Sequence, residues 1–191
     1  MKKIIVLLQE IIRFCVEFLE EPLRNNTSLL ARHAIKKLYQ TECMIDTGVI
    51  ITNKKNFFAH GRSSLYHACY ILNGHGKFVL GENSHLGAFC YVNTNFGSVI
   101  IGNDVAIGPG TKIFSYSNHY ETHKKVTEAR ITADVIVGNN VFIGANCILL
   151  PGTVIRDNVV VGAGSIVKGE LSSNSVYAGN PLREIKRGWY E

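Results

Sequence analysis

Histidine side chains offer this chain its best acid–base chemistry, because an imidazole exchanges its proton near neutral pH. Only His119 and His123 fall in the polar stretch 115–134, which reads SYSNHYETHKKVTEARITAD. The remaining histidines are His33, His60, His67, His75 and His85. His119 stands near the start of the stretch, so it could be exposed enough to act as a general base and still be held in place. A solvated loop histidine is the alternative, and spacing alone leaves both interpretations open.

The sequence on either side of this stretch repeats every six residues. Aliphatic residues recur at that spacing and are usually followed by glycine, at Leu80, Leu86, Val92, Ile101, Ile107, Ile113, Val137, Ile143, Leu149, Ile155, Val161 and Val167. Such a repeat is typical of a parallel β-helix, in which each unit is a short strand and a corner. Each aliphatic side chain stacks on its equivalent one coil away. We therefore predict an all-β fold over residues 43–182, with Ile143, Leu149, Ile155 and Val161 buried.

Two interruptions of the six-residue period must leave the regular coils. The first runs from Asn93 to Gly97 and shifts the register between Val92 and Ile101. The second is the polar stretch 115–134, which lacks inward aliphatic residues and is expected to be extruded from one edge. Extruded loops on rigid scaffolds often carry chemistry, so this loop is the first place to look for a site.

The two ends of the chain depart from the repeat. Residues 1–42 have apolar residues at helical spacing, so we predict an N-terminal helical segment there. It could cap the core or contact another copy, with peripheral membrane contact as the alternative; its apolar run is too short and too charged to span a bilayer. Residues 183–191 are assigned to a C-terminal basic tail.

Composition limits the function classes. The net charge of +5 suits an anionic ligand, an acidic polymer or a membrane surface, with a role in solubility alone as the alternative. A hydrophobic fraction of 46% excludes a wholly disordered chain. The basic residues are not interleaved with aromatic ones, so nucleic-acid binding is not expected. The cysteine count of 5 is odd and no pair is spaced C-x-x-C, which argues against a disulfide framework or a zinc knuckle and predicts a cytoplasmic protein.

A set of longer motifs narrows the fold family. The motifs are IGNDVAIGPG (101–110), SNHYE (117–121), VIVGNNVFIGANCILLPGTVI (135–155), VVGAGSIVKG (160–169) and AGNPLREIK (178–186). In this order they resemble the left-handed β-helix acyltransferases of the hexapeptide-repeat superfamily, and within it the sugar and polysaccharide O-acetyltransferases, such as the maltose and galactoside acetyltransferases. The resemblance implies left-handed coils, acetyl-CoA as co-substrate and no metal. It also implies a homotrimer with active sites between two prisms, where the loop 115–134 reaches the neighbour.

The same resemblance implies roles for single residues. His119 matches the base that deprotonates the acceptor hydroxyl, although Tyr120 follows it where the family usually has proline. Asn93 matches a polar residue on the acceptor side, with a corner asparagine as the alternative. The positions that match coenzyme A contacts are Phe142, Ala145, Ala163, Lys168, Arg183 and Lys186. Of these, the alanines match backbone contacts to the pantetheine arm, and Arg183 and Lys186 match positions near the nucleotide phosphates.

The expected reaction is acetyl transfer from acetyl-CoA to a sugar hydroxyl, on a cell-surface polysaccharide or its precursor. An N-acetyltransferase or a serine acetyltransferase-like enzyme of the same fold is one alternative. A zinc-dependent carbonic anhydrase is another alternative. Such an enzyme would need three histidine ligands, and this chain could supply them from His60, His67, His75 and His85. A β-helix that serves only assembly or binding is the alternative from a different class.

Overall fold

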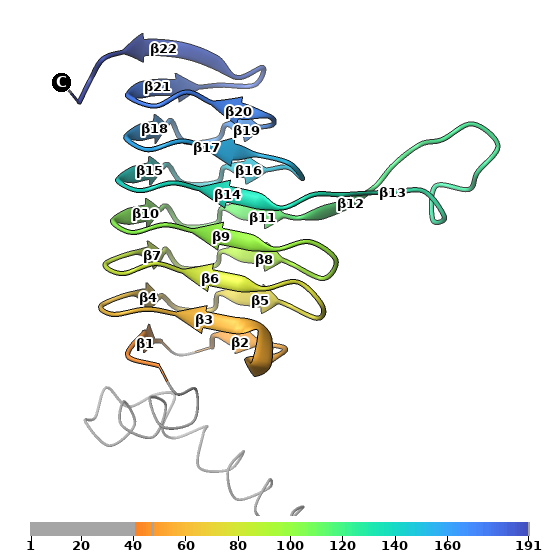
Figure 1. Cartoon of the computed structure of the whole chain (residues 1–191), viewed down its shortest axis with the longest axis horizontal. Helices are drawn as coiled ribbons and strands as arrows, with labels where there is room; N and C mark the ends of the chain where they lie inside the picture. The colour runs from red at the N-terminus through yellow and green to blue at the C-terminus, as the bar shows by residue number, and fades with distance from the viewer. Residues whose placement is uncertain (1–40, 47, 191) are drawn as a thin grey trace, which may run out of the picture.

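The protein winds through successive coils with one short strand in each of three parallel sheets, here called A, B and C. The structure is a computed structural model and describes residues 41–46 and 48–190. In Figure 1 the strands of sheet C face the viewer and run leftwards as the coils rise, whereas those of sheet A, except the last, run rightwards behind them. This arrangement is consistent with a left-handed β-helix. The predicted helical segment 1–42 lies outside the described residues except for its last two, which are not helical.

The strands are short and evenly distributed. Sheet A contains β1 (Met44–Ile45), β4 (Ser64–Leu65), β7 (His85–Leu86), β10 (Val105–Ile107), β15 (Val141–Ile143), β18 (Val159–Val161), β21 (Ser175–Ala178) and β22 (Arg183–Arg187). Sheet B contains β2 (Ile50–Ile51), β5 (Tyr70–Leu72), β8 (Tyr91–Asn93), β11 (Lys112–Phe114), β16 (Ile148–Leu149) and β19 (Ile166–Val167). Sheet C contains β3 (Phe57–Ala59), β6 (Phe78–Leu80), β9 (Val99–Ile101), β14 (Val135–Val137), β17 (Val154–Ile155) and β20 (Glu170–Leu171). One 3₁₀ turn, η1 (Lys54–Asn56), precedes β3.

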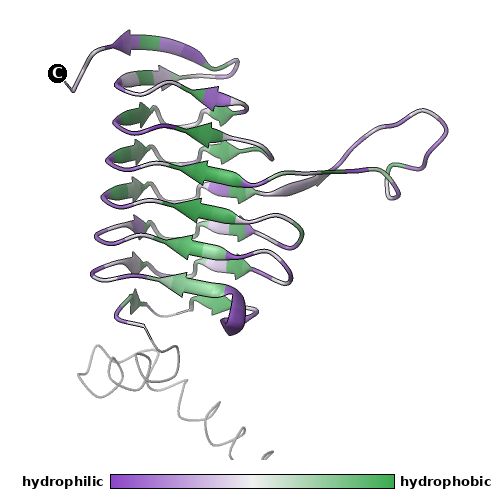
Figure 2. Cartoon of the chain, in the orientation of Figure 1, coloured by the Kyte–Doolittle hydropathy of each residue, from purple (hydrophilic) through white to green (hydrophobic). Residues whose placement is uncertain are grey.

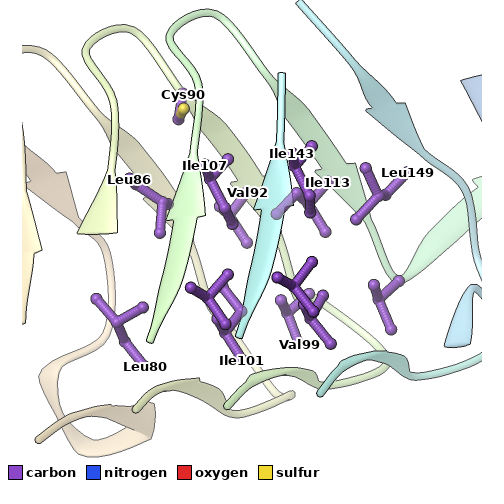
Figure 3. Close-up of a cluster of buried hydrophobic side chains, with 14 of the residues drawn as sticks. Leu80, Leu86, Cys90, Val92, Val99, Ile101, Ile107, Ile113, Ile143 and Leu149 are labelled. Carbon is purple, nitrogen blue, oxygen red and sulfur yellow. The ribbon is translucent and has the colours of Figure 1, made fainter. Parts of the chain in front are cut away.

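The core is the inside of the prism, where equivalent aliphatic residues of successive coils stack. Side chains alternate between the two faces of a strand, so each short strand sends its aliphatic residues inward. Ile143, Leu149, Ile155 and Val161 are at most 1% exposed, which confirms their predicted burial. Figure 3 shows such inward side chains of neighbouring coils lying side by side, and Figure 2 shows mostly apolar strands joined by more polar corners.

The corner that joins sheet C to sheet A is held by a ladder of asparagine side chains. The Asn140 amide donates to Asn158 at 2.8 Å, and the Asn158 amide donates to Asn174 at 2.9 Å. All three residues have positive φ, between 52° and 59°, a backbone region that asparagine tolerates better than most residues. The ladder therefore fixes the spacing of the upper coils along this edge.

The corner that joins sheet B to sheet C carries the departures from the repeat. The turn 93–97 is longer than a regular corner, and one coil above it residues 115–134 leave the prism altogether. They begin and end as an antiparallel hairpin, β12 (Tyr116–Asn118) and β13 (Arg130–Thr132), which projects far from the coils in Figure 1. The predicted extrusion of this loop is confirmed.

The C-terminal segment differs from the tail expected over residues 183–191. Residues Arg183–Arg187 form β22, which pairs antiparallel with β21 in sheet A. The sequence could not show this pairing, because the six-residue period has ended by this point. Across the described residues, no helix is long and apolar enough to cross a membrane.

Candidate active site

The root of the hairpin is fixed by buried hydrogen bonds. Ser115 is fully buried, and its hydroxyl, with one proton to donate, lies 2.9 Å from the carbonyl oxygen of Asn93 and 2.8 Å from that of Gly97. The amide of Ala133 donates to the Ser115 carbonyl at 3.0 Å, which closes the hairpin. Where the chain re-enters the prism, the Asp134 carboxylate accepts a bond from the Ser98 amide at 2.7 Å. The hairpin therefore leaves a rigid corner.

His119 lies directly after β12 and continues its pairing. Its amide donates to the carbonyl oxygen of Ala129 at 2.9 Å, so its backbone is held by the returning strand. The side chain is exposed, and the ring lies 4.8 Å from the ring of Tyr120, centroid to centroid. An imidazole that is accessible on a fixed backbone is suited to proton transfer.

The second loop histidine has a different setting. His123 lies at the exposed tip of the loop and has a positive φ of 64°. Ion pairs surround it along the chain, from Lys124 to Glu121 at 2.8 Å and from Lys125 to Glu128 at 3.6 Å. No strand pairing holds its backbone, so His119 is the better placed of the two.

Asn93 ends β8 directly beneath the hairpin root, opposite Phe114 of β11. It is 7% exposed, and its side-chain oxygen accepts a bond from the Asn95 amide at 3.0 Å. This bond braces the turn 93–97, as expected of a corner asparagine. The residue nevertheless lies at the corner from which the His119 hairpin departs, so an acceptor-side role stays a prediction.

Phe142 and Lys186 share one row across the outer face of sheet A. Strand register links Phe142 to Val160, Val160 to Val176 and Val176 to Lys186, and Phe142 is 49% exposed. A register shift between Val176 and Tyr177 pairs Arg183 with Ala178. This bulge brings Arg183 and Lys186 onto the same face although they are three residues apart.

The neighbouring Arg187 is engaged elsewhere. Its guanidinium donates to Glu184 at 2.8 Å and 2.9 Å, and this bond lowers the pKa of Glu184. Of the basic residues in β22, Arg183 and Lys186 therefore face outward and are not paired with Glu184.

Ala145 and Ala163 stack at the corner that joins sheet A to sheet B. The coils approach closely there, because a Cβ added to Gly144 would lie 2.5 Å from the Ala163 nitrogen. Ala163 is exposed and Ala145 is half-buried, and no described residue accepts a hydrogen bond from either amide. The corner thus presents two unpaired N–H groups one above the other.

The predicted residues form two groups on opposite sides of sheet B. Phe142, Ala145, Ala163, Arg183 and Lys186 lie on sheet A and at its corner with sheet B. The other group lies at the corner between sheets B and C and contains His119, Asn93 and the exposed Lys168. One prism by itself does not bring His119 to the coenzyme-side group.

Sequence reasoning missed the aromatic surroundings of the hairpin root. Tyr91 lies beside Tyr70 and Phe114, with ring centroids 5.6 Å and 5.8 Å away. Burial raises the pKa of Tyr91, and the nearby hydroxyls of Tyr70 and Tyr116 add to the shift. Phe96 contacts His75, Tyr116 and Arg130 in the same region. The signal in the sequence that could have indicated this cluster was the aromatic residue Phe96 inside the irregular turn 93–97.

The histidines of the zinc alternative do not converge. His60 lies at the corner between sheets C and A, His67 between A and B, His75 between B and C, and His85 within sheet A. Burial lowers the pKa of His85, which packs on Tyr66. In the described part of the chain, no group of three or more potential metal ligands occurs.

Comparison with known proteins agrees with the repeated coils and their interruption. A family model described as the hexapeptide repeat of succinyl-transferase matches residues 78–114 and 134–168, and the gap between the two matches is the hairpin. The chain is 36% identical over 116 residues to galactoside O-acetyltransferase of Escherichia coli K12, covering 57% of this chain and 56% of that protein. A second protein of that strain, named as an O-acetyl transferase of lipopolysaccharide biosynthesis, is 31% identical, covering 60% of this chain and 62% of that protein.

The fold also matches solved structures. An N-acyltransferase from Bacillus cereus, in complex with dTDP and 3-hydroxybutyryl-CoA, has a TM-score of 0.70 at 22% identity, covering 81% of this chain and 87% of that chain. This likeness concerns the fold alone. The chain spans between half and two thirds of the length of these two sequence relatives. By its repeats the chain is similar to hexapeptide-repeat transferases, and its sequence relatives include proteins named as O-acetyltransferases.

Proposed function

We propose that the protein transfers the acetyl group of acetyl-CoA to a hydroxyl of a sugar. The observation that carries the proposal is His119, an exposed imidazole whose backbone is paired at the end of a rigidly rooted hairpin. The sequence relatives named as O-acetyltransferases support the choice of a hydroxyl acceptor.

The proposed reaction needs one base and no redox chemistry. His119 takes the proton of the acceptor hydroxyl as its oxygen attacks the thioester carbonyl. The carbon–sulfur bond of the resulting tetrahedral intermediate then breaks, which forms the acetyl ester. The imidazolium returns the proton to the departing thiolate, so the products are the O-acetyl sugar and coenzyme A as its thiol.

The other group of predicted residues is suited to coenzyme A. Arg183 and Lys186 share the outward face of β22, where cations can bind the nucleotide phosphates. The unpaired amides of Ala145 and Ala163 can donate to carbonyl oxygens of the pantetheine arm. Phe142 offers an exposed ring on the adjoining face. Lys168 lies across sheet B from these residues, so its contact would come from a different side.

The separation of these two groups supports a site shared between copies of the chain. Within one prism, sheet B lies between His119 and the coenzyme-side corner. A hairpin that projects from one prism could instead reach the corner of a neighbour (Figure 1). In a homotrimer, each copy would extend its hairpin to one neighbour and accept the hairpin of the other, so the shared sites would be identical.

The acceptor we favour is a cell-surface polysaccharide or its precursor, as the lipopolysaccharide name of one relative suggests. An amine acceptor is the second candidate, because the Bacillus cereus protein of the same fold is an N-acyltransferase. A cytoplasmic location fits the described cysteines, which are buried and free. Membrane contact through residues 1–42 stays a separate proposal.

A pair of histidine variants tests the function. Purified protein is mixed with acetyl-CoA and a panel of sugars and amines, and released thiol is followed. His119→Ala should lower kcat by roughly a hundredfold or more, the usual effect of losing a general base, with little change in coenzyme A binding. His123→Ala is the matched control and should be mild. If neither variant matters, acyl transfer by this hairpin is wrong; if only His123→Ala does, the base has been misassigned.

A further inference from the structure

A cluster of rings and one cation lies where the hairpin meets the turns below it. It is made of His75, Phe96, Tyr116 and Arg130 and is here called the Phe96 cluster. The rings of Phe96 and His75 stack with centroids 5.8 Å apart and an angle of 13°. Tyr116 meets Phe96 edge-on at 5.0 Å, and the Arg130 guanidinium carbon lies 5.1 Å from the ring centroid. Phe96 is therefore the centre of the cluster.

The cluster joins the stacked turns of the prism to the projecting hairpin. Phe96 and His75 belong to turns stacked on the prism, where the Gly76 amide donates to the Thr94 carbonyl at 2.8 Å and the Thr94 hydroxyl donates to the Gly76 carbonyl at 3.0 Å. Tyr116 and Arg130 belong to the two strands of the projecting hairpin. Phe96 thus links a fixed platform to the element that carries His119.

Strand alternation decides which face of the hairpin meets this platform. Pairing is direct between Tyr116 and Thr132 and between Asn118 and Arg130, so Tyr116 and Arg130 lie on one face. His119 continues the ladder opposite Ala129 and lies on the other face. Holding the first face against Phe96 therefore turns His119 away from the lower coils.

We propose that Phe96 is a positioning residue: through Tyr116 and Arg130 it fixes the roll of the hairpin about its own axis and so aims His119 at the reacting groups. This inference rests on the proposed function, because aim matters only if His119 is the base. A general base must meet its proton within hydrogen-bond reach, so a small rotation of the hairpin is enough to misplace it.

The test compares Phe96→Ala with a matched control elsewhere on the prism. Phe58 on the outer face of sheet C is 41% exposed, against 42% for Phe96, and the Lys77 ammonium lies 6.0 Å from its ring centroid. Phe58→Ala therefore removes a similar ring and a similar cation contact far from the hairpin. Phe96→Tyr is the conservative variant, because it keeps a ring for both Tyr116 and Arg130.

The first readout is kinetic, with acetyl-CoA and a simple galactoside as probe acceptor. Phe96→Ala should lower kcat roughly tenfold to a hundredfold. The KM for acetyl-CoA should stay unchanged, because the coenzyme-side residues lie on sheet A. Phe96→Tyr should restore kcat, and Phe58→Ala should leave it unaltered. In a His119→Ala background, Phe96→Ala should not lower kcat further, because the imidazole that Phe96 positions is absent.

The second readout needs no acceptor. Hydrogen exchange of the His119 amide reports its bond to Ala129 and should become at least several-fold faster in Phe96→Ala, but not in Phe58→Ala. Unchanged exchange together with normal kcat, while His119→Ala is inactive, would overturn the positioning role and leave the proposed function intact. Full activity of His119→Ala would instead overturn the proposed function and, with it, any catalytic role for Phe96.

Discussion

Replacing Ile155 by aspartate puts the β-helix register to its most demanding test. Ile155 is 1% exposed and stands in a column of inward residues of sheet C, between Val137 below and Leu171 above. Its neighbour Val154 points outward, between Ile136 and Glu170. Adjacent positions on a two-residue strand therefore have opposite environments, and the same substitution at each should have very different effects.

The expected cost of Ile155→Asp has two parts. Removing the packed side chain costs about 2–5 kcal/mol, as for other large-to-small core changes. Keeping the carboxyl un-ionised at pH 7, about 3 pH units above its ordinary pKa, costs about 4 kcal/mol more, since each unit is worth about 1.4 kcal/mol. The total is comparable to the whole stability of a typical domain, about 5–15 kcal/mol. Ile155→Asp should therefore fail to fold at neutral pH.

Thermal melting followed by calorimetry and circular dichroism measures this difference. Val154→Asp places its carboxylate in solvent beside Glu170 and should cost about 1 kcal/mol at most, a shift of about 2–4 °C in Tm. Ile155→Asp should show no cooperative transition. A soluble Ile155→Asp protein that melts cooperatively near the wild-type Tm would refute the assignment of Ile155 to the core.

Further predictions concern the coenzyme, the coil spacing and pH. Replacing Arg183 and Lys186 by glutamine should raise the KM for acetyl-CoA roughly tenfold per residue with kcat nearly intact; an equal effect with dephospho-CoA would show that the 3′-phosphate is not their partner. Gly144→Ala should lower Tm by several degrees, because the new Cβ would lie 2.7 Å from the Ala163 Cα; an unchanged Tm would contradict that close approach. Burial lowers the pKa of His85, so stability should fall as pH drops through about 6.5, and His85→Gln should melt with a weaker pH dependence.

The sequence predicted those parts of the fold that depend on a local repeat. The six-residue period located the buried aliphatic residues, and its failure over residues 115–134 located the hairpin. The same period continues below Leu80 through Leu65 and Ile71, both fully buried. Both residues lie within the all-β range that the sequence predicted from residue 43.

Features that depend on stacking between distant turns could not be read from the sequence. Phe96 meets Arg130 only because an irregular turn and a returning strand lie one above the other. The strand Arg183–Arg187 pairs through a bulge, which the six-residue repeat cannot predict. The division of the predicted site residues between two corners also depends on which sheet each coil segment joins, a property of the assembled prism.

The direction of β22 has a consequence for how the protein behaves in concentrated solution. In a stack of parallel coils the last strand has unpaired backbone N–H and C=O groups along its outer edge. A coil of another molecule could pair with them and extend the stack without limit. Strand β22 reverses direction on sheet A and covers that edge with Arg183, Glu184, Lys186 and Arg187. A further parallel coil would have to pair with a strand that runs the other way and carries mostly charged side chains. On this sheet the chain thus ends its own solenoid and discourages end-to-end fibre formation.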